Sequence, residues 1–267
     1  MRKIVDLHCH YVASAPDAIA HFRRLVAQPE LVRVAVNVVQ FKLEYSPEFP
    51  FMSTFDTGNE ELAQLVEAVD SPKLIPWCFV DPLEPEPEKQ AEYWVRQRGM
   101  RGIKMYPAMG WYPNDPRALP VYQFAQEMDI PVLLHMGRCA PHPGLRSKYG
   151  RPIYLEEVGL ACPRLKLIIG HFANMWRYEA LNISAGFPNF VFDLTSSGAH
   201  DFEALRQVIA HPSLGLRRIV LGTDGTGETN LATASATLDR LAAAGFTEEQ
   251  LEAMAWRNGL AVLGEEA

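Results

Sequence analysis

The stretch KIVDLHCH, from Lys3 to His10, starts as an apolar run and ends in two histidines separated by one residue. Its isoleucine and valine favour a β-strand. Seven further short runs rich in apolar and β-branched residues follow along the chain. These runs are Arg33–Phe41, Leu74–Asp81, Arg101–Tyr106, Ile130–Met136, Leu165–His171, Phe190–Thr195 and Ile219–Thr223.

The spacing of the eight runs indicates a parallel sheet. Each run starts 25 to 41 residues after the previous one, which leaves room for one crossover helix. The runs are continuously apolar, as strands are when both faces of a sheet are covered. Helical patterns lie between them, at Ala15–Ala27, Asn59–Val69, Glu86–Arg98, Ile153–Cys162 and Phe202–Ala210.

Eight strands with intervening helices predict an α/β fold, a single (β/α)₈ TIM barrel spanning residues 1–267. The alternative is an open doubly wound sheet. That fold has a glycine-rich phosphate turn after its first strand, where this chain has DLHCH, so we favour the barrel. Ser14 is predicted to cap the first helix, and the tail from Thr247 to Gly264 predicts two closing helices.

Charge and composition restrict the classes of function. The 267 residues carry a net charge of −7 and no basic run, so we expect no nucleic acid and no membrane as a partner. We expect no signal peptide, and no apolar run approaches the roughly 20 residues that span a bilayer. Four scattered cysteines without a C-x-x-C pair suit a reducing cytoplasm. These features predict a cytoplasmic enzyme for a small-molecule substrate, with a homo-oligomer as an open expectation.

Polar side chains end five of the predicted strands. Side chains alternate along a strand, so His8 and His10 should point to one side and Cys9 to the other. The other polar ends are Lys104 in GIKMYP, His135 in LLHMG, His171 in IIGHF and Asp224 in VLGTDG. A lone H-x-H is usually incidental and a lone G-T-D is usually a turn. Together, at the rim where a barrel builds its site, these residues predict a divalent metal, with zinc first and manganese, iron or nickel as alternatives.

The same set of strand ends resembles the amidohydrolase superfamily. The phrases PRLKLIIGHF, FVFDLTS, RIVLGTD and WRNGLAVLG are similar to the amidohydrolase-related branch that includes aminocarboxymuconate-semialdehyde decarboxylase. The similarity covers nearly the whole chain. The resemblance implies that one metal ion is held by His8, His10, His135 and Asp224, and that His171 lies beside it as an acid/base.

Lys104 leaves the number of ions open. In two-metal members of the superfamily, a lysine that ends the fourth strand is carboxylated and bridges the ions, and KMYPA resembles the KLYPA of some dihydroorotases. Lys104 and His171 would then complete a second metal site. Alternatively, Lys104 is an ammonium that grips a substrate carboxylate, or a structural lysine. We favour one metal because the other phrases resemble the one-metal branch.

Weaker candidates surround these residues. Asp6 should share the inward face with the histidines, either as a hydrogen-bond acceptor that orients a ligand or as a buried structural acid. Long loops are expected at Lys42–Gly58, Pro107–Leu119 and Gly137–Pro152. Basic loop residues could bind an anionic substrate or simply face solvent, and aromatic residues could line a pocket or pack beneath a loop. The basic residues are Arg138, His142, Arg146 and Arg177, and the aromatic residues are Tyr106, Trp111 and Tyr112.

The predicted chemistry is hydrolysis by metal-activated water of an ester, lactone or amide of a small, carboxylated substrate. Asp224 would accept the proton of the water and pass it to the leaving group, and His171 would stabilise the oxyanion. The alternative is non-oxidative decarboxylation of a small aromatic or unsaturated acid, which needs the same groups. A third hypothesis is a metal-binding barrel without catalysis.

Overall fold

The computed structural model describes residues 2–41, 43, 46–49, 56–195, 200–227 and 229–266. Much of the loop predicted at Lys42–Gly58, and Ser196 at the end of FVFDLTS, lie outside the described residues. Eight parallel strands form one sheet whose order follows the chain. The strands are β1 (Ile4–His10), β2 (Leu31–Asn37), β3 (Leu74–Phe79), β4 (Ile103–Met105), β5 (Val132–Leu134), β6 (Leu167–Ile169), β7 (Phe190–Asp193) and β8 (Ile219–Val220).

The sheet closes on itself between its last and first strands. Leu7 N–H donates to the carbonyl of Leu221 at 3.0 Å, and Asp224 N–H donates to the carbonyl of His8 at 2.6 Å. Cys9 and Gly225 extend this parallel pairing beyond β8. The predicted barrel is therefore confirmed, and the open doubly wound sheet is wrong.

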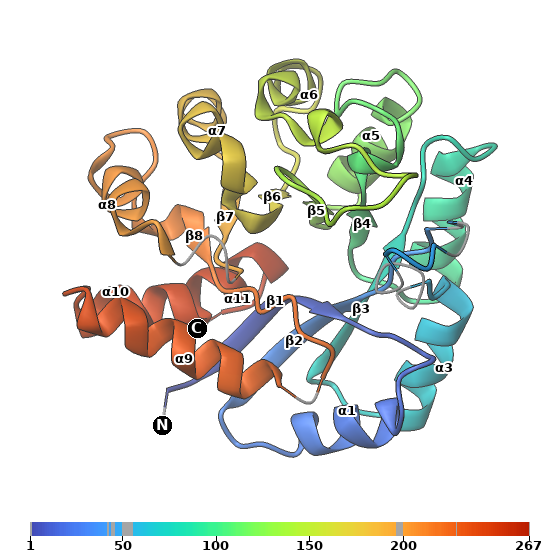
Figure 1. Cartoon of the computed structure of the whole chain (residues 1–267), viewed down its shortest axis with the longest axis horizontal. Helices are drawn as coiled ribbons and strands as arrows, with labels where there is room; N and C mark the ends of the chain where they lie inside the picture. The colour runs from blue at the N-terminus through green and yellow to red at the C-terminus, as the bar shows by residue number, and fades with distance from the viewer. Residues whose placement is uncertain are drawn as a thin grey trace.

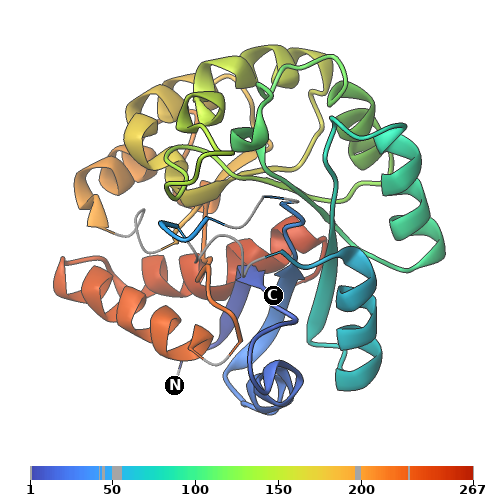
Figure 2. The same ribbon diagram turned by 45° about the vertical axis from the view of Figure 1, so that its right-hand side comes forward.

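Helices surround the ring of strands (Figures 1 and 2). They are α1 (Ala18–Val26), α3 (Asn59–Val69), α4 (Pro87–Glu92), α5 (Leu119–Glu127), α6 (Leu155–Ala161), α7 (Arg177–Ser184), α8 (Phe202–Ala210), α9 (Asn230–Ala243), α10 (Glu248–Glu252) and α11 (Asn258–Leu263). Within the described part of the chain, no helix is both long and apolar enough to cross a bilayer.

Two predicted helices, α3 and α8, have the bounds that the sequence indicated. The first helix differs, because it starts at Ala18 and its N-cap is Asp17 in a left-handed conformation, so the Ser14 cap is wrong. The tail also differs, because α10 and α11 are joined by a π-helical turn at Ala253–Arg257 into one continuous run instead of two helices.

This C-terminal run closes the base of the barrel. Leu260 of α11 belongs to the interior hydrophobic cluster, together with side chains from β1, β2, β3, β5, β6, β7 and β8. A Cβ added at Gly259 would lie 2.7 Å from Cγ1 of Val5, so a glycine is needed where α11 crosses β1. The base is packed with apolar side chains, which leaves the opposite, C-terminal end of the strands for chemistry.

A bulge in β1 sets which side chains face the interior. From Asp6 to Cys9 the strand advances three residues while β2 advances only two, from Val34 to Val36. Instead of pairing with a strand, His8 N–H donates to Oδ1 of Asp6 at 3.1 Å. The extra residue breaks the alternation, so that Leu7 packs in the interior cluster and His8 also turns inward.

Asp6 consequently lies on the outer side of the barrel, against the start of α9. Its Oδ2 accepts from Nδ2 of Asn230 at 2.7 Å and from Oγ1 of Thr223 at 2.6 Å. The prediction that Asp6 shares the inward face with the histidines is therefore wrong. It is a buried structural acid that satisfies the bulge and the turn after β8, and burial raises its pKa to about 6.

Candidate metal centre

His8, His10 and Asp224 converge at the open end of the barrel. Nε2 of His8 lies 3.2 Å from Nε2 of His10, and Oδ1 of Asp224 lies 3.3 Å from the first and 3.0 Å from the second. Asp224 follows β8 in a left-handed conformation, with φ of 58°, which an aspartate tolerates better than most residues. Both histidines are buried, whereas the Asp224 side chain is 38% exposed, so the cluster opens toward the barrel mouth.

Asp193, which the sequence analysis did not single out, fixes the tautomer of His8. It ends β7 and is fully buried. Its Oδ2 lies 2.5 Å from Nδ1 of His8, and its Oδ1 accepts from Thr195 N–H at 2.7 Å. A carboxylate at Nδ1 places the imidazole proton there and leaves the lone pair on Nε2. Burial raises the pKa of Asp193 to about 6.

The donor set fits a divalent cation. Two imidazole nitrogens and a carboxylate oxygen within 4.8 Å of one another repel unless a proton or cation lies among them. Burial lowers the pKa of both histidines, which favours the neutral form that ligates metals. Burial alone would raise the pKa of Asp224, but His8 and the hydrogen bond from His10 hold it well below its usual value.

His135 and His171 form a second pair beside this cluster. Nε2 of His171 lies 2.9 Å from Nδ1 of His135, and the rings of His171 and His8 are 5.1 Å apart. Among the described residues, the buried Nε2 of His135 has no hydrogen-bond partner. The structure thus brings the ligand atoms of three of the four predicted ligands within 4.8 Å of one another. The fourth, His135, contacts His171, which in turn lies beside His8. The orphaned nitrogen remains a suitable metal ligand.

The loop after β6 sets the position of His171, because β6 itself ends at Ile169. Nδ1 of His171 lies 2.8 Å from Oγ1 of Thr195, and its backbone N–H donates to Oδ2 of Asp193 at 3.3 Å. Burial lowers the pKa of His171. Asp193 therefore links His8 of the cluster to the predicted acid/base.

Lys104 is fully buried beside the cluster. Its Nζ lies 2.9 Å from Nε2 of His8, the nitrogen whose lone pair Asp193 leaves available. Burial lowers the pKa of Lys104 to about 8. The residue is therefore part of the site, and it is not a lysine that reaches solvent at the rim.

The weaker candidates separate into those near the cluster and those elsewhere. The ring of Tyr106 stacks on His135 at 4.0 Å. Trp111 is buried in the hydrophobic core and Tyr112 packs against Tyr149 and Tyr154. Arg177 pairs with Asp201 at 3.2 Å.

The loop after β5 forms a hollow of about 500 Å³ that three candidates line together. They are Arg138, His142 and Arg146. The side chains of Arg138 and Arg146 are exposed, whereas His142 is buried and its Nδ1 accepts from Gly144 N–H at 3.0 Å. The guanidinium of Arg146 donates to the carbonyls of Pro143 and Leu145 at 2.7 and 2.8 Å, so part of its hydrogen-bonding capacity is used within the loop.

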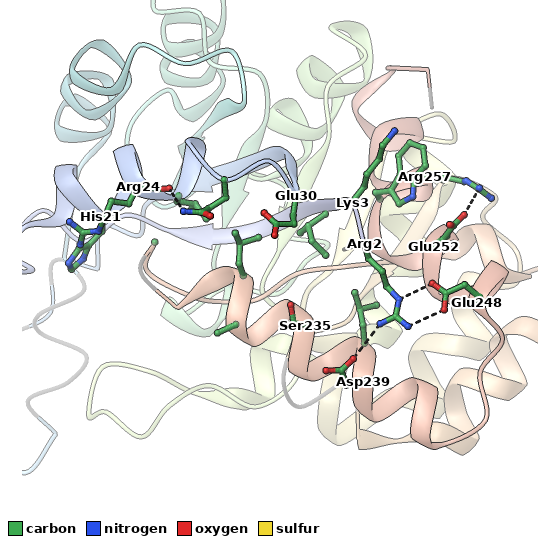
Figure 3. A pocket seen from close by; sticks show the side chains of 18 residues that line it. Arg2, Lys3, His21, Arg24, Glu30, Ser235, Asp239, Glu248, Glu252 and Arg257 are labelled. Atoms are coloured by element: carbon green, nitrogen blue, oxygen red, sulfur yellow. Dashed lines mark hydrogen bonds and ion pairs between the residues drawn. The ribbon is translucent and has the colours of Figure 1, made fainter.

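A groove of about 1160 Å³ on the outer surface is separate from the cluster. It runs between α1 and α9 and reaches the N-terminal end of β1 (Figure 3). Its charges are largely satisfied by one another, since Arg2 pairs with Glu248 and Asp239, and Arg257 pairs with Glu252. The groove holds none of the strand-end histidines, so we assign the chemistry to the barrel mouth.

Comparison with known proteins identifies the family. The amidohydrolase family model Amidohydro_2 matches residues 5–264, and the chain therefore belongs to this family of the metal-dependent amidohydrolase superfamily. Its structural neighbours are TIM-barrel proteins of that superfamily, as the strand-end motifs indicated. No curated protein sequence matches the chain significantly.

Several solved structures share the fold over nearly the whole chain. A 2,6-dihydroxybenzoate decarboxylase from Rhizobium is 14% identical, with a TM-score of 0.66 and 99% of both chains covered. A 5-carboxyvanillate decarboxylase from Novosphingobium aromaticivorans, complexed with manganese, is 12% identical, with a TM-score of 0.65 and 98% and 96% covered. A dihydroorotase from Campylobacter jejuni is 15% identical, with a TM-score of 0.65, covering all of this chain and 84% of that one. At these identities the similarity establishes the fold.

Proposed function

We propose that this protein is a metal-dependent hydrolase acting on an ester, lactone or amide of a small, carboxylated substrate. The observation that carries the proposal is the convergence of His8, His10 and Asp224, with Asp193 holding His8 in the tautomer that presents Nε2. His135 is the fourth proposed ligand, because its buried Nε2 lacks a partner among the described residues.

A divalent ion bound there would polarise a carbonyl and make water nucleophilic at neutral pH. The imidazole and carboxylate donors suit zinc, our first choice, and also manganese, which the similar carboxyvanillate decarboxylase contains. We propose a single ion, since the described residues include one group of three donors that could hold a metal, namely His8, His10 and Asp224.

Asp224 is the group that we propose moves the proton. Its carboxylate is the exposed member of the cluster, with 38% of the side chain accessible, so it can contact a water molecule at the barrel mouth and accept its proton. The same carboxylate then delivers the proton to the leaving alcohol or amine.

His171 is the group that we propose stabilises the charge that develops on the substrate oxygen. Its ring lies between His8 and His135, and Thr195 orients it through Nδ1. As an N–H donor it would stabilise the oxyanion. Lys104, as a buried cation, would bind a carboxylate of the substrate.

Decarboxylation is the second candidate. The similarity to two decarboxylases over nearly the full chain favours it, and the same residues would serve. His171 would then protonate the substrate carbon after CO₂ leaves.

A screen of lactones, esters, amides and carboxylated aromatics with the zinc- and manganese-loaded protein tests the proposal. We expect hydrolysis products that disappear in Asp224→Asn. Release of CO₂ from an aromatic or unsaturated acid would overturn the proposal of hydrolysis in favour of decarboxylation. A protein that binds metal tightly and turns over none of these classes would support the metal-binding barrel without catalysis.

A further inference from the structure

The segment that carries His171 has an unusual backbone. Three consecutive residues, His171, Phe172 and Ala173, adopt left-handed conformations with φ of 56°, 49° and 46°. Residues with a Cβ rarely adopt this conformation, and three in succession persist only where the surroundings hold them. The strand ends two residues earlier, so the strand does not hold His171 in place.

The ring side of this turn is held by Asp193 at the end of β7, which accepts from the backbone N–H, and by Thr195, two residues further on, which lies at Nδ1. These two contacts both act on His171 itself. Phe172 and Ala173 are held by core packing, and the ring of Phe172 lies 4.7 Å from that of Phe192. The far end of the turn is held by a separate contact.

Asn174 supplies that contact from the first position after the turn. Its Oδ1 accepts from its neighbour Met175 N–H at 2.6 Å and from Arg138 N–H, in the loop after β5, at 2.7 Å. One oxygen thus joins the end of the left-handed turn to a neighbouring loop. Both donors are backbone groups, so the bond is independent of which side chains they carry.

Gly137 makes this close approach possible. Its φ is +86°, and a Cβ at this position would lie 2.8 Å from the carbonyl carbon of Ala173 and 2.9 Å from the backbone N of Asn174. Gly150, further along the same loop, accepts from Gly137 N–H at 2.8 Å, so Gly137 is held from its other side as well. The loop after β5 therefore packs directly on the turn.

We propose that Asn174 is a positioning residue for His171, which it holds by fastening the left-handed turn to the loop after β5. The inference rests on the proposed function, in which His171 stabilises the oxyanion or transfers a proton. The bond is made to the backbone N–H of Arg138, so it fastens the loop main chain and does not involve the arginine side chain.

Three variants test the role by kinetics with the metal-loaded protein. In Asn174→Ala the shared acceptor is lost, and we expect kcat to fall about 100-fold, as a displacement of a reacting group by about 1 Å can cause. KM should stay within about threefold, because the proposed contact acts in the transition state. Asn174→Asp retains an oxygen for both N–H groups and should restore kcat. Asn182→Ala removes an exposed asparagine of α7 and should have no effect.

The position of His171 can also be measured without substrate, by NMR of histidine imidazoles in the metal-depleted protein. His171→Gln identifies the signals of His171 by their loss. We expect these signals to shift in Asn174→Ala and in Gly137→Ala, and to stay in place in Asn174→Asp and Asn182→Ala.

Unchanged His171 signals or an unchanged kcat in Asn174→Ala would overturn the positioning role. Failure of the proposed function has a different signature, since His171→Gln would then retain full activity while the NMR signals still reported the effect of Asn174.

Discussion

Replacing Asp193 with asparagine tests how His8 is prepared to bind a metal. Among the described residues, the hydrogen-bond partners of this carboxylate are all donors: Nδ1 of His8 and His171 N–H at Oδ2, and Thr195 N–H at Oδ1. An asparagine has one carbonyl oxygen and one NH₂ group. In one orientation the NH₂ faces His8 and His171, and in the other it faces Thr195 N–H. Either orientation leaves at least one buried donor opposed.

The magnitude follows from these contacts. If the NH₂ faces His8, the imidazole proton must move to Nε2, and the lone pair of Nε2 is then no longer available to bind a metal. Losing a carboxylate behind a ligating histidine weakens metal binding about 10- to 100-fold, or about 1.4 to 2.8 kcal/mol. The opposed donors should also lower the free energy of unfolding of the metal-depleted protein by about 1–3 kcal/mol.

The assay is a calorimetric titration of the chelator-treated protein with zinc or manganese. Urea unfolding of the same samples measures the change in stability. Asp239→Asn is the matched control, since Asp239 is an exposed acid that pairs with Arg2 at 3.4 Å. A dissociation constant for Asp193→Asn within twofold of the parent protein would refute the assigned tautomer of His8.

Four further changes have defined outcomes. Gly222→Ala would place a Cβ 2.4 Å from Oδ1 of Asp193. We expect the free energy of unfolding in urea to fall by about 1–3 kcal/mol and metal binding to weaken. An unchanged urea midpoint would contradict this close packing. Asp6→Ala leaves four donors at the β1 bulge and the turn after β8 unsatisfied. We expect the free energy of unfolding in urea to fall by at least about 3 kcal/mol, and a fall of less than about 1 kcal/mol would argue against the bulge. Lys104→Met should retain one bound ion per chain by elemental analysis, whereas a drop from two ions to one would show a bridging, carboxylated lysine. Chelation should abolish turnover and lower Tm while the far-ultraviolet circular dichroism persists, because the apolar core contains no ligand; activity should return when the metal is added back.

The barrel was predictable because its signal is repeated eight times. Each strand is an apolar run, and an error of a few residues at one end does not change the count. The bounds were less accurate, as the last run shows: Ile219–Thr223 was predicted, but the regular strand β8 spans only Ile219–Val220. Beyond Val220 the chain stays hydrogen-bonded to β1 through Leu221 and Asp224, but as an irregular extension of the strand.

The site was predictable in its residues and less so in its geometry. His8 and His10 lie together as expected. The position predicted for Asp6 from alternation along β1 was wrong, because a bulge inserts one residue between Asp6 and Cys9. That bulge depends on closure against β8, which lies more than 200 residues away, so no local pattern reveals it. Asp193 could have been predicted, since it is an acidic residue that follows an apolar run, just as Asp224 does.

The closed base of the barrel has a consequence for how the molecule is made. β1 leaves the ribosome before the other strands of this barrel, yet its partners Leu221 and Gly259 are synthesised more than 200 residues later. One edge of β1 therefore stays unpaired until more than 200 further residues have been translated. Such exposed edges attract other chains, so we expect slow, temperature-sensitive folding and a dependence on chaperones during high-level expression.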